Sequence, residues 1–208
     1  MRADSSPNDP LRSLRLLAWG ALLSVALLLG AVAAWRAFMP VDSGLPVLPL
    51  GGDFSLGDDR GQTFRLGDQR GQVVLLSFGF TSCPDICPLT LARYRAVLAG
   101  LSQDAARLTP VMISVDPARD TPARLHEYVR YFHPRIIGLT GTPAELAVVA
   151  RRFGAVIRVP APGEPGQVMH SDYLYLLDTQ GRVRRLYDQQ AGVDAIVREV
   201  RALLREAR

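Results

Sequence analysis

Cys83 and Cys87 are the only two cysteines of this chain, and they lie four positions apart in the segment FGFTSCPDICP. Thiolates are nucleophiles and soft metal ligands, so the pair could form a structural disulfide, act as a redox pair or provide two ligands to a metal ion. A structural disulfide would close a loop of only a few residues, where the gain in chain entropy is smallest. The spacing therefore favours a redox or a metal-binding role.

The supply of further ligands limits which metal could bind. Zinc and iron–sulfur sites built from cysteines usually need four protein ligands, whereas this chain has two cysteines and three histidines. Two thiolates with one imidazole suit copper better. His170 is expected directly after a loop, at the start of a strand over 173–177, which makes it the candidate third ligand. His126 and His133 lie in HEYVRYFHP, where positions on a helix surface or at a helix C-terminus suffice. The residues alone leave the role of His170 open.

The elements next to the cysteines would control their reactivity. Residues 73–80 form a continuous apolar run that predicts a buried central strand, and residues 90–101 have the apolar spacing of a helix. This order places the thiols near backbone N–H groups and the positive end of the helix dipole, which favours the thiolate. If Cys83 lies in the first helical turn, both sulfurs project to one side of the helix.

The rest of the chain alternates strands with helices, which predicts an α/β domain with a central mixed sheet. Thr121-Pro122 and Thr142-Pro143 each place an N-cap before a proline in the first helical position, and Glu145 completes a capping box in the second case. The other expected elements are a hairpin around residues 59–61, strands over 111–115, 155–159, 173–177 and 183–187, and a terminal helix from about Asp194.

An apolar segment without charges, residues 16–35, is long enough to cross a bilayer as a helix. Arg12 and Arg15 precede it, so the positive-inside rule predicts a cytoplasmic N-terminus and an exported C-terminal domain. A cleaved signal peptide is the alternative, because residues 31–33 resemble a cleavage site. The expected organisation is a cytoplasmic segment (1–15), a transmembrane helix or uncleaved signal anchor (16–38), a linker (39–52) and one globular domain (53–208).

The charge of the exported part is nearly balanced. All 24 basic residues of the chain are arginine, and residues 40–208 hold 20 of them against 18 acidic residues. A nucleic-acid partner normally requires positive charge clustered on one face. We therefore expect no nucleic-acid partner. The protein is expected to contact the membrane through its N-terminal helix.

Four segments, FGFTSCPDICP, SVDPARDTP, YVRYFHPRIIGLTGTP and HSDYLYLLD, resemble in order and spacing the SCO/SenC family of membrane-anchored copper-delivery proteins. The resemblance covers about residues 50–190. It implies a thioredoxin-like fold, copper ligands at Cys83, Cys87 and His170, and delivery of copper to the dinuclear copper centre of cytochrome c oxidase. The implied partners are the copper-receiving oxidase subunit, an upstream copper donor and a thiol reductant. Together with the apolar segment, it implies a single-pass protein of a bacterial inner membrane whose domain faces the periplasm.

Three further positions bear on this resemblance. Asp116 and Asp120 match the acidic positions of the family's DPxRDTP segment, and we interpret both as part of a turn that leads into a helix. Many family members have aspartate directly before the histidine, where this chain has Met169. A thioether could assist Cu(I), but methionine adapts readily to packing, so we expect Met169 to pack under a loop.

Two functions fit the same residues. The first is a copper carrier with no enzymatic activity. The second is a membrane-anchored thiol–disulfide oxidoreductase that keeps the oxidase's copper-ligand cysteines reduced, with Cys83 and Cys87 as its catalytic pair. The CxxxC spacing, instead of CxxC, and the lack of a proline immediately before the strand of His170 favour the carrier. A peroxide-reducing enzyme is disfavoured, because the turn has no obvious accompanying catalytic set.

Overall fold

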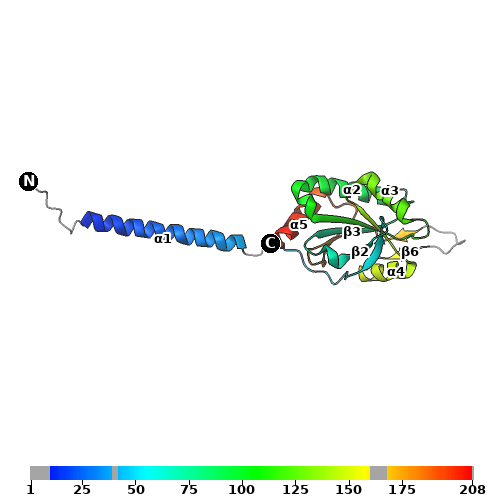
Figure 1. Ribbon diagram of the computed structural model, residues 1–208, viewed down its shortest axis with the longest axis horizontal. Coiled ribbons are helices and arrows are strands. Elements are labelled where there is room, and N and C mark those ends of the chain that lie inside the picture. The colour runs from blue at the N-terminus through cyan, green and yellow to red at the C-terminus, as the bar shows by residue number, and fades with distance from the viewer. Residues whose placement is uncertain (1–9, 39–41, 160–167, 208) are drawn as a thin grey trace, which may run out of the picture. The chain divides into compact units, whose positions relative to one another are not determined.

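The computed structural model describes residues 10–38, 42–159 and 168–207, and the chain divides into two compact units, Met1–Pro40 and Val41–Arg208. The first unit contains one long helix, α1 (Pro10–Phe38) (Figure 1). Its segment Leu14–Val32 is long and apolar enough to cross a membrane, and none of it is buried. Three predicted segments lie partly or wholly outside the described residues: positions 1–9 of the cytoplasmic segment, positions 39–41 of the linker and the loop 160–167.

The second unit is built on a seven-stranded mixed sheet with the order β2-β1-β5-β4-β3-β8-β9. The central strand β3 pairs in parallel with β4 and antiparallel with β8. The predicted α/β domain with a mixed sheet is therefore confirmed. The strands are β1 (Ser55–Asp58), β2 (Thr63–Arg65), β3 (Val73–Gly79), β4 (Leu108–Ser114), β5 (Ile137–Thr140), β8 (Leu174–Leu177) and β9 (Val183–Tyr187).

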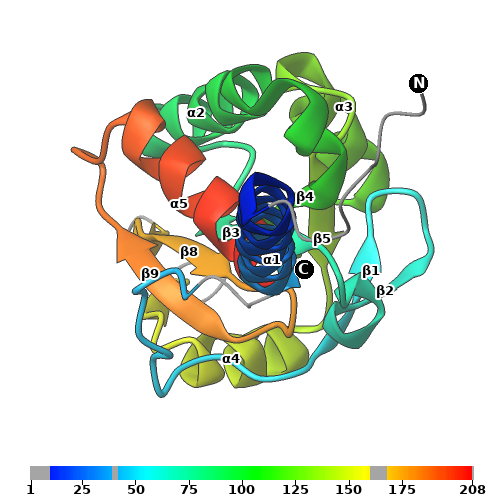
Figure 2. The same cartoon turned by 90° about the vertical axis from the view of Figure 1, so that its left-hand side faces the viewer.

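Helices cover both faces of this sheet, which explains why every residue of β3 is buried. Figure 2 shows α2, α3 and α5 over one face and α4 over the other. Each face has its own apolar cluster, one centred on Leu91 and Ile196, the other on Phe78 and Phe153. The helices are α2 (Ile86–Leu101), α3 (Pro122–Phe132), α4 (Pro143–Arg152) and α5 (Val193–Glu206), with short 3-10 helices η1 (Leu66–Gln69) and η2 (Ser102–Arg107).

The capping signals in the sequence mark the observed helix starts. The Thr121 hydroxyl accepts a hydrogen bond from the Arg124 backbone N–H at 3.3 Å, and α3 begins at the following proline. The Glu145 backbone N–H donates to the Thr142 hydroxyl at 3.3 Å, and the Thr142 backbone N–H donates to the Glu145 carboxylate at 2.8 Å. Both predicted caps, including the capping box, are confirmed.

Two elements near the cysteines differ from expectation. Helix α2 begins at Ile86, so Cys83 precedes the helix and Cys87 lies in its first turn. Pro88 is tolerated there because the first-turn N–H groups have no partner within the helix. His170 does not open β8. It ends a separate two-residue strand, β7 (Met169–His170), which pairs antiparallel with β6 (Ile157–Arg158) in a small second sheet.

Candidate metal centre

Strand β3 delivers the chain to the site at its carboxyl end. After Gly79 the backbone makes a tight turn, in which the Cys83 N–H donates to the Phe80 carbonyl at 3.3 Å. Cys83 is partly exposed on this turn, whereas Cys87, one helical turn into the protein, is only 3% exposed. The two thiols thus differ in solvent access although they share one loop.

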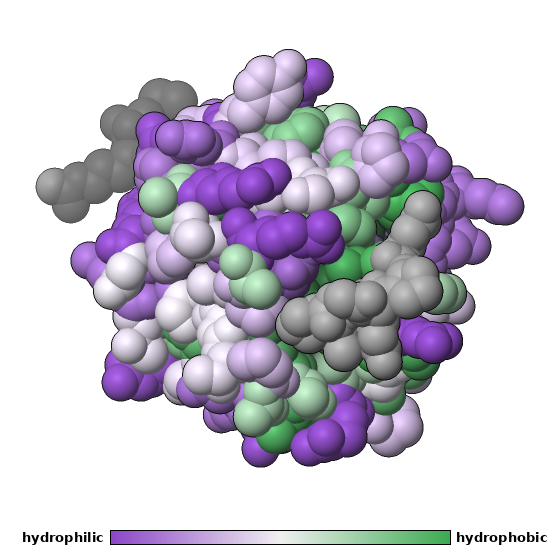
Figure 3. All heavy atoms as spheres, turned by 90° about the vertical axis from the view of Figure 1, so that its right-hand side faces the viewer, coloured by the Kyte–Doolittle hydropathy of each residue, from purple (hydrophilic) through white to green (hydrophobic). Residues whose placement is uncertain are grey.

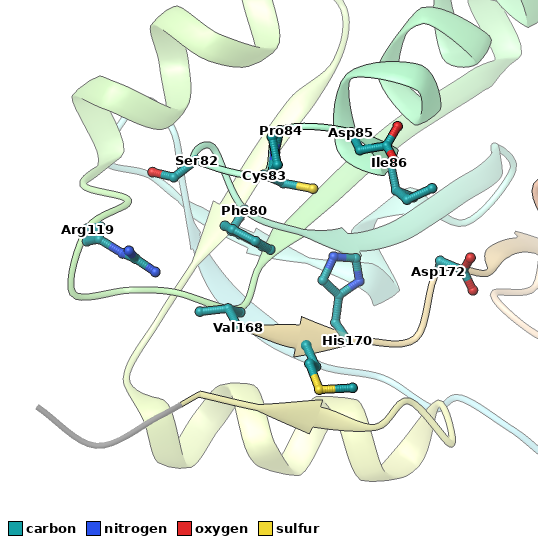
Figure 4. Close-up of a pocket in the computed structure, with 11 residues that line it drawn as sticks. Phe80, Ser82, Cys83, Pro84, Asp85, Ile86, Arg119, Val168, His170 and Asp172 are labelled. Atoms are coloured by element: carbon teal, nitrogen blue, oxygen red, sulfur yellow. The ribbon is translucent and has the colours of Figure 1, made fainter. Parts of the chain in front are cut away.

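His170 approaches the same turn from the small second sheet. In Figure 4 its imidazole points toward the loop that carries Cys83, and the Phe80 ring lies between β7 and that loop. The Phe80 and His170 rings meet edge to face, with centroids 5.8 Å apart and planes at 87°. One ligand atom each from Cys83, Cys87 and His170 lie within 4.8 Å of one another. The structure therefore brings together the three residues that the sequence singled out.

The hydrogen bonds of His170 fix its tautomer. Its Nδ1 lies 2.9 Å from the carbonyl oxygen of Ser171, which can only accept, so Nδ1 carries the hydrogen. The unprotonated Nε2 then faces the sulfur of Cys87 at 3.6 Å. An imidazole whose other nitrogen donates to a carbonyl is oriented as metal-binding histidines usually are.

The two thiols have opposite acidities. Partial burial opposes ionisation of Cys83, but hydrogen bonds from the backbone N–H groups of Asp85, Ile86 and Cys87 outweigh it and lower the pKa of its thiol. Burial raises the pKa of the Cys87 thiol to about 12. Cys87 therefore carries its hydrogen at neutral pH, and that hydrogen is available to Nε2 of His170.

The site opens into a cavity of about 700 Å³. The cavity is lined by residues between Phe80 and Ile86, by Arg119, and by Val168, Met169, His170 and Asp172. The carboxylates of Asp85 and Asp172 and the guanidinium of Arg119 belong to this lining (Figure 4). Charges of both signs thus surround the opening. An ion held by the three donors would be accessible from solvent on this side.

Met169 does not pack as expected. It is 62% exposed, so the prediction that it packs under a loop is wrong. Neighbouring residues of a strand project to opposite faces, and His170 uses the face toward the cysteines. The end of the domain that carries β6 shows apolar residues among hydrophilic ones (Figure 3). Val156 and Val159, on either side of β6 in the chain, are exposed like Met169, at 70% and 45%.

The remaining histidines are engaged elsewhere. Nδ1 of His126 lies 2.6 Å from the Asp59 carboxylate, and Nδ1 of His133 accepts from the Arg135 backbone N–H at 3.2 Å. His133 is the C-cap residue of α3. Within the described ranges, Cys83, Cys87 and His170 form the only cluster of such side chains that could hold a metal ion.

The donor set determines what the site can bind. Donor atoms within 4.8 Å of one another approach the sum of two metal–ligand bonds of about 2.0–2.3 Å, so small side-chain rotations suffice to bind one ion. Two sulfurs select soft ions such as Cu(I), and an imidazole also suits Cu(II). The chemistry of the three donors therefore fits copper in either oxidation state.

Two residues contribute to the site in ways that the sequence did not predict. Gly79 is one: a Cβ atom there would lie 3.0 Å from Sγ of Cys87 and 2.9 Å from Cε of Met112. Asp120 is the other: it lies in the loop before α3 and binds Thr81 of the cysteine turn. The interpretation of Asp116 as a turn residue agrees with its carbonyl, which accepts from the N–H groups of Arg119 and Asp120. For Asp120 that interpretation is incomplete, since its side chain reaches the cysteine turn.

Comparison with known proteins places the chain among related sequences. The family model described as SCO1/SenC matches residues 45–205. Protein SCO2 of Saccharomyces cerevisiae mitochondria is 38% identical over 161 residues, which cover 74% of this chain and 54% of that protein. Protein SenC of Rhodobacter capsulatus is 35% identical over 156 residues, 74% of this chain and 71% of SenC. The chain spans about half the length of the yeast relatives that it matches.

Solved structures agree with this placement. Copper-bound ScoI of Bradyrhizobium japonicum is 33% identical, with a TM-score of 0.67, covering 73% of this chain and 98% of that one. Copper-bound ScoI of Arabidopsis thaliana is 37% identical, with a TM-score of 0.66 and the same coverage of 73% and 98%. With the mixed sheet and its flanking helices, these likenesses confirm the predicted thioredoxin-like fold.

Proposed function

Because this chain belongs to the SCO1/SenC family, we propose that it binds copper through Cys83, Cys87 and His170 and delivers the ion to the dinuclear copper centre of cytochrome c oxidase. The observation that supports this most strongly is the convergence of two sulfurs and one imidazole, from separate elements, within 4.8 Å. Relatives of the same fold at 33% and 37% identity are known with copper bound.

The layout of the donors suits release as well as binding. Cys87 is buried in the first turn of α2, whereas Cys83 and His170 lie at the edge of an open cavity. Three protein ligands leave a copper ion able to accept another. A partner could therefore approach from the cavity and displace Cys83 or His170 before Cys87. The chain acts in this scheme as a carrier and not as an enzyme.

The location follows from the first unit of the chain. We infer that α1 anchors the protein in a bacterial inner membrane and that Arg12 and Arg15 keep the N-terminus in the cytoplasm, so that the domain faces the periplasm. The copper-receiving oxidase subunit, a copper donor and a thiol reductant would meet it there. A reporter fused to the C-terminus should be active only in its periplasmic form.

A second candidate function is thiol–disulfide exchange, favoured by the unequal acidities of the two thiols. The Cys83 thiolate would attack a disulfide of the oxidase subunit and form a mixed disulfide, releasing one substrate thiolate. Cys87 would then lose its proton and attack Sγ of Cys83, releasing the second substrate thiolate and leaving a Cys83–Cys87 disulfide. A thiol reductant must supply two electrons and two protons to restore the pair.

The variant His170→Ala separates the two functions. A carrier needs the imidazole to complete its copper site, whereas disulfide exchange needs only the two thiols and access to them. In cells that carry only this variant, we expect oxidase copper content and activity to fall while the Cys83–Cys87 pair still forms and breaks a disulfide. The control is His133→Ala, which removes a histidine outside the site. Full oxidase assembly with His170→Ala would refute the carrier and favour the reductase.

A further inference from the structure

Asp120 is a buried carboxylate that contacts the cysteine turn from a different loop. It is 1% exposed and lies between β4 and α3. Its Oδ2 accepts from the Thr81 backbone N–H at 3.0 Å, and its Oδ1 accepts from the Thr81 hydroxyl at 2.6 Å. Thr81 is the second residue of the Phe80–Cys83 turn, so one carboxylate fixes that turn through both its backbone and its side chain.

Other polar groups extend this contact. The Ser114 hydroxyl, at the end of β4, donates to Oδ2 of Asp120 at 2.6 Å. Nε of Arg124 donates to the Thr81 hydroxyl oxygen at 2.9 Å, and its Nη2 donates to the Ser82 hydroxyl at 3.0 Å. We call Asp120, Thr81, Ser114 and Arg124 the turn clamp. It connects the end of β4 and the start of α3 to the two residues that precede Cys83.

The charge of Asp120 has no ion-pair partner among the described residues. The donors to its carboxylate are an N–H group and two hydroxyl groups, all neutral. Arg124 binds Thr81 and Ser82 instead, and Arg119 pairs with Asp116. Asp120 contacts Thr81, which precedes Cys83 by two residues, so its charge is held next to the turn that carries this thiol.

We propose that Asp120 is a positioning residue that holds the Cys83 turn in its metal-binding conformation, and that its charge strengthens the binding of Cu(II) relative to Cu(I). The second part follows from Coulomb's law, because the attraction between a fixed carboxylate and an ion is proportional to the ion's charge. Two thiolates by themselves favour Cu(I). The nearby negative charge lets the site hold both oxidation states. This inference rests on the proposed copper-binding function and deepens it.

The test uses the full chain in detergent. It is titrated separately with Cu(I) and with Cu(II), in both cases without oxygen. Asp120→Asn keeps the size of the side chain and removes its charge. We expect it to weaken Cu(II) binding about tenfold more than Cu(I) binding. Thr81→Val removes the hydroxyl but keeps the Asp120 charge. It should change the Cu(II)–thiolate absorption and electron paramagnetic resonance spectra and leave the ratio of the two affinities near that of the wild type. Thr81→Ser, which restores a hydroxyl, should recover the wild-type spectra.

A measurement without copper tests the positioning part separately. Hydrogen exchange of the peptide that contains Thr81 and Cys83 should accelerate in Asp120→Asn, because the Thr81 N–H loses its charged acceptor. Asp178→Asn is the matched control, because it removes another buried carboxylate at the opposite end of β3. It should leave the affinity ratio unchanged, and exchange in this peptide should also be unchanged once it is corrected for the lower global stability of this variant.

Each outcome has a distinct meaning. Unchanged exchange in Asp120→Asn, together with wild-type spectra in Thr81→Val, would refute the positioning role. An affinity ratio in Asp120→Asn equal to that of the wild type would refute the role of the charge. If the wild-type chain binds neither ion, the proposed function and the role of the charge fail together, and hydrogen exchange still decides whether Asp120 holds the turn.

Discussion

Asp178 and Asp120 are both buried carboxylates that hold a turn, but their surroundings differ. Asp178, in the turn between β8 and β9, is 4% exposed and binds Arg184 at 2.9 Å and Arg182 at 2.8 Å. Asp120 is bound only by neutral donors. Because β8 runs antiparallel to β3, and β4 runs parallel to it, the two turns lie at opposite ends of the sheet.

The paired charge of Asp178 contributes to the stability of the fold, whereas the charge of Asp120, which is unpaired among the described residues, is placed to affect ligand binding. Arg184 has 4% of its side chain exposed and also binds Glu206 of α5, at 3.0 Å, and the carbonyl of Leu45. The charges at this end are therefore paired within the protein, where they stabilise the fold. At the other end, the charge of Asp120 is held against Thr81 in the turn that leads to Cys83, and an internal ion pair would weaken its attraction for a cation bound there. Substitutions at the two ends should affect different properties.

The largest effect is expected from removing a thiol. Cys87→Ser should abolish stable copper binding, because a hydroxyl is a hard, poorly ionised ligand, and Cys83→Ser should do the same. Equilibrium titration with Cu(I) measures this directly. The controls His126→Ala and His133→Ala should leave the stoichiometry unchanged, and a loss of copper in either control equal to that in His170→Ala would refute the site.

The next effect concerns the Asp178 end of the sheet. Asp178→Asn should lower the free energy of unfolding by about 3 kcal/mol, because it leaves the buried Arg184 without its partner, and copper affinity should not change. Urea unfolding measures the loss. Arg182→Gln, at a 50% exposed partner, should cost less than about 1 kcal/mol. A reduced copper affinity in Asp178→Asn would show that the two ends are coupled.

The lowered pKa of Asp178 predicts that its contribution to the stability of the fold is lost in acid. Although burial opposes it, hydrogen bonds from Arg182, Arg184 and the Gln180 backbone lower the pKa of Asp178 below its usual 3.8. A carboxyl whose pKa is lower in the folded state contributes stability above its unfolded pKa, and the contribution is lost as the pH falls through the folded pKa. Asp178→Asn should therefore be less stable than the wild type at pH 7, with the difference shrinking below about pH 4.

A smaller effect on stability and copper affinity is expected from filling the space between Gly79 and Cys87. Gly79→Ala would place a methyl group 3.0 Å from Sγ of Cys87, so the thiol or Met112 must move, at a cost of about 1–3 kcal/mol. Copper affinity should fall with stability. The matched control is Gly57→Ala on β1, where the nearest atom, the Thr140 carbonyl oxygen, is 3.5 Å away. Equal effects of the two substitutions on copper affinity would contradict a specific role for Gly79.

The sequence predicted the outline of this fold but not all of its site. Strand β9 has the expected bounds, because its alternation of side chains and its flanking turn residues are local features of the sequence. The caps at Thr121 and Thr142 were also predicted, because they involve residues only three positions apart. The start of α2 and the strand of His170 were misplaced, because a proline in a first turn looks like a break and a two-residue strand has no period. The contact of Asp120 with Thr81 joins residues 39 positions apart, and no local pattern encodes it.

The most direct test of the copper site is X-ray absorption at the copper edge of the full chain, loaded separately with Cu(I) and Cu(II). The wild type should show two sulfur neighbours and one imidazole nitrogen. The variant His170→Ala should lose the nitrogen and keep both sulfurs, with a larger loss of affinity for Cu(II) than for Cu(I). An unchanged nitrogen contribution in His170→Ala, or a wild-type spectrum without sulfur, would contradict copper binding by Cys83, Cys87 and His170.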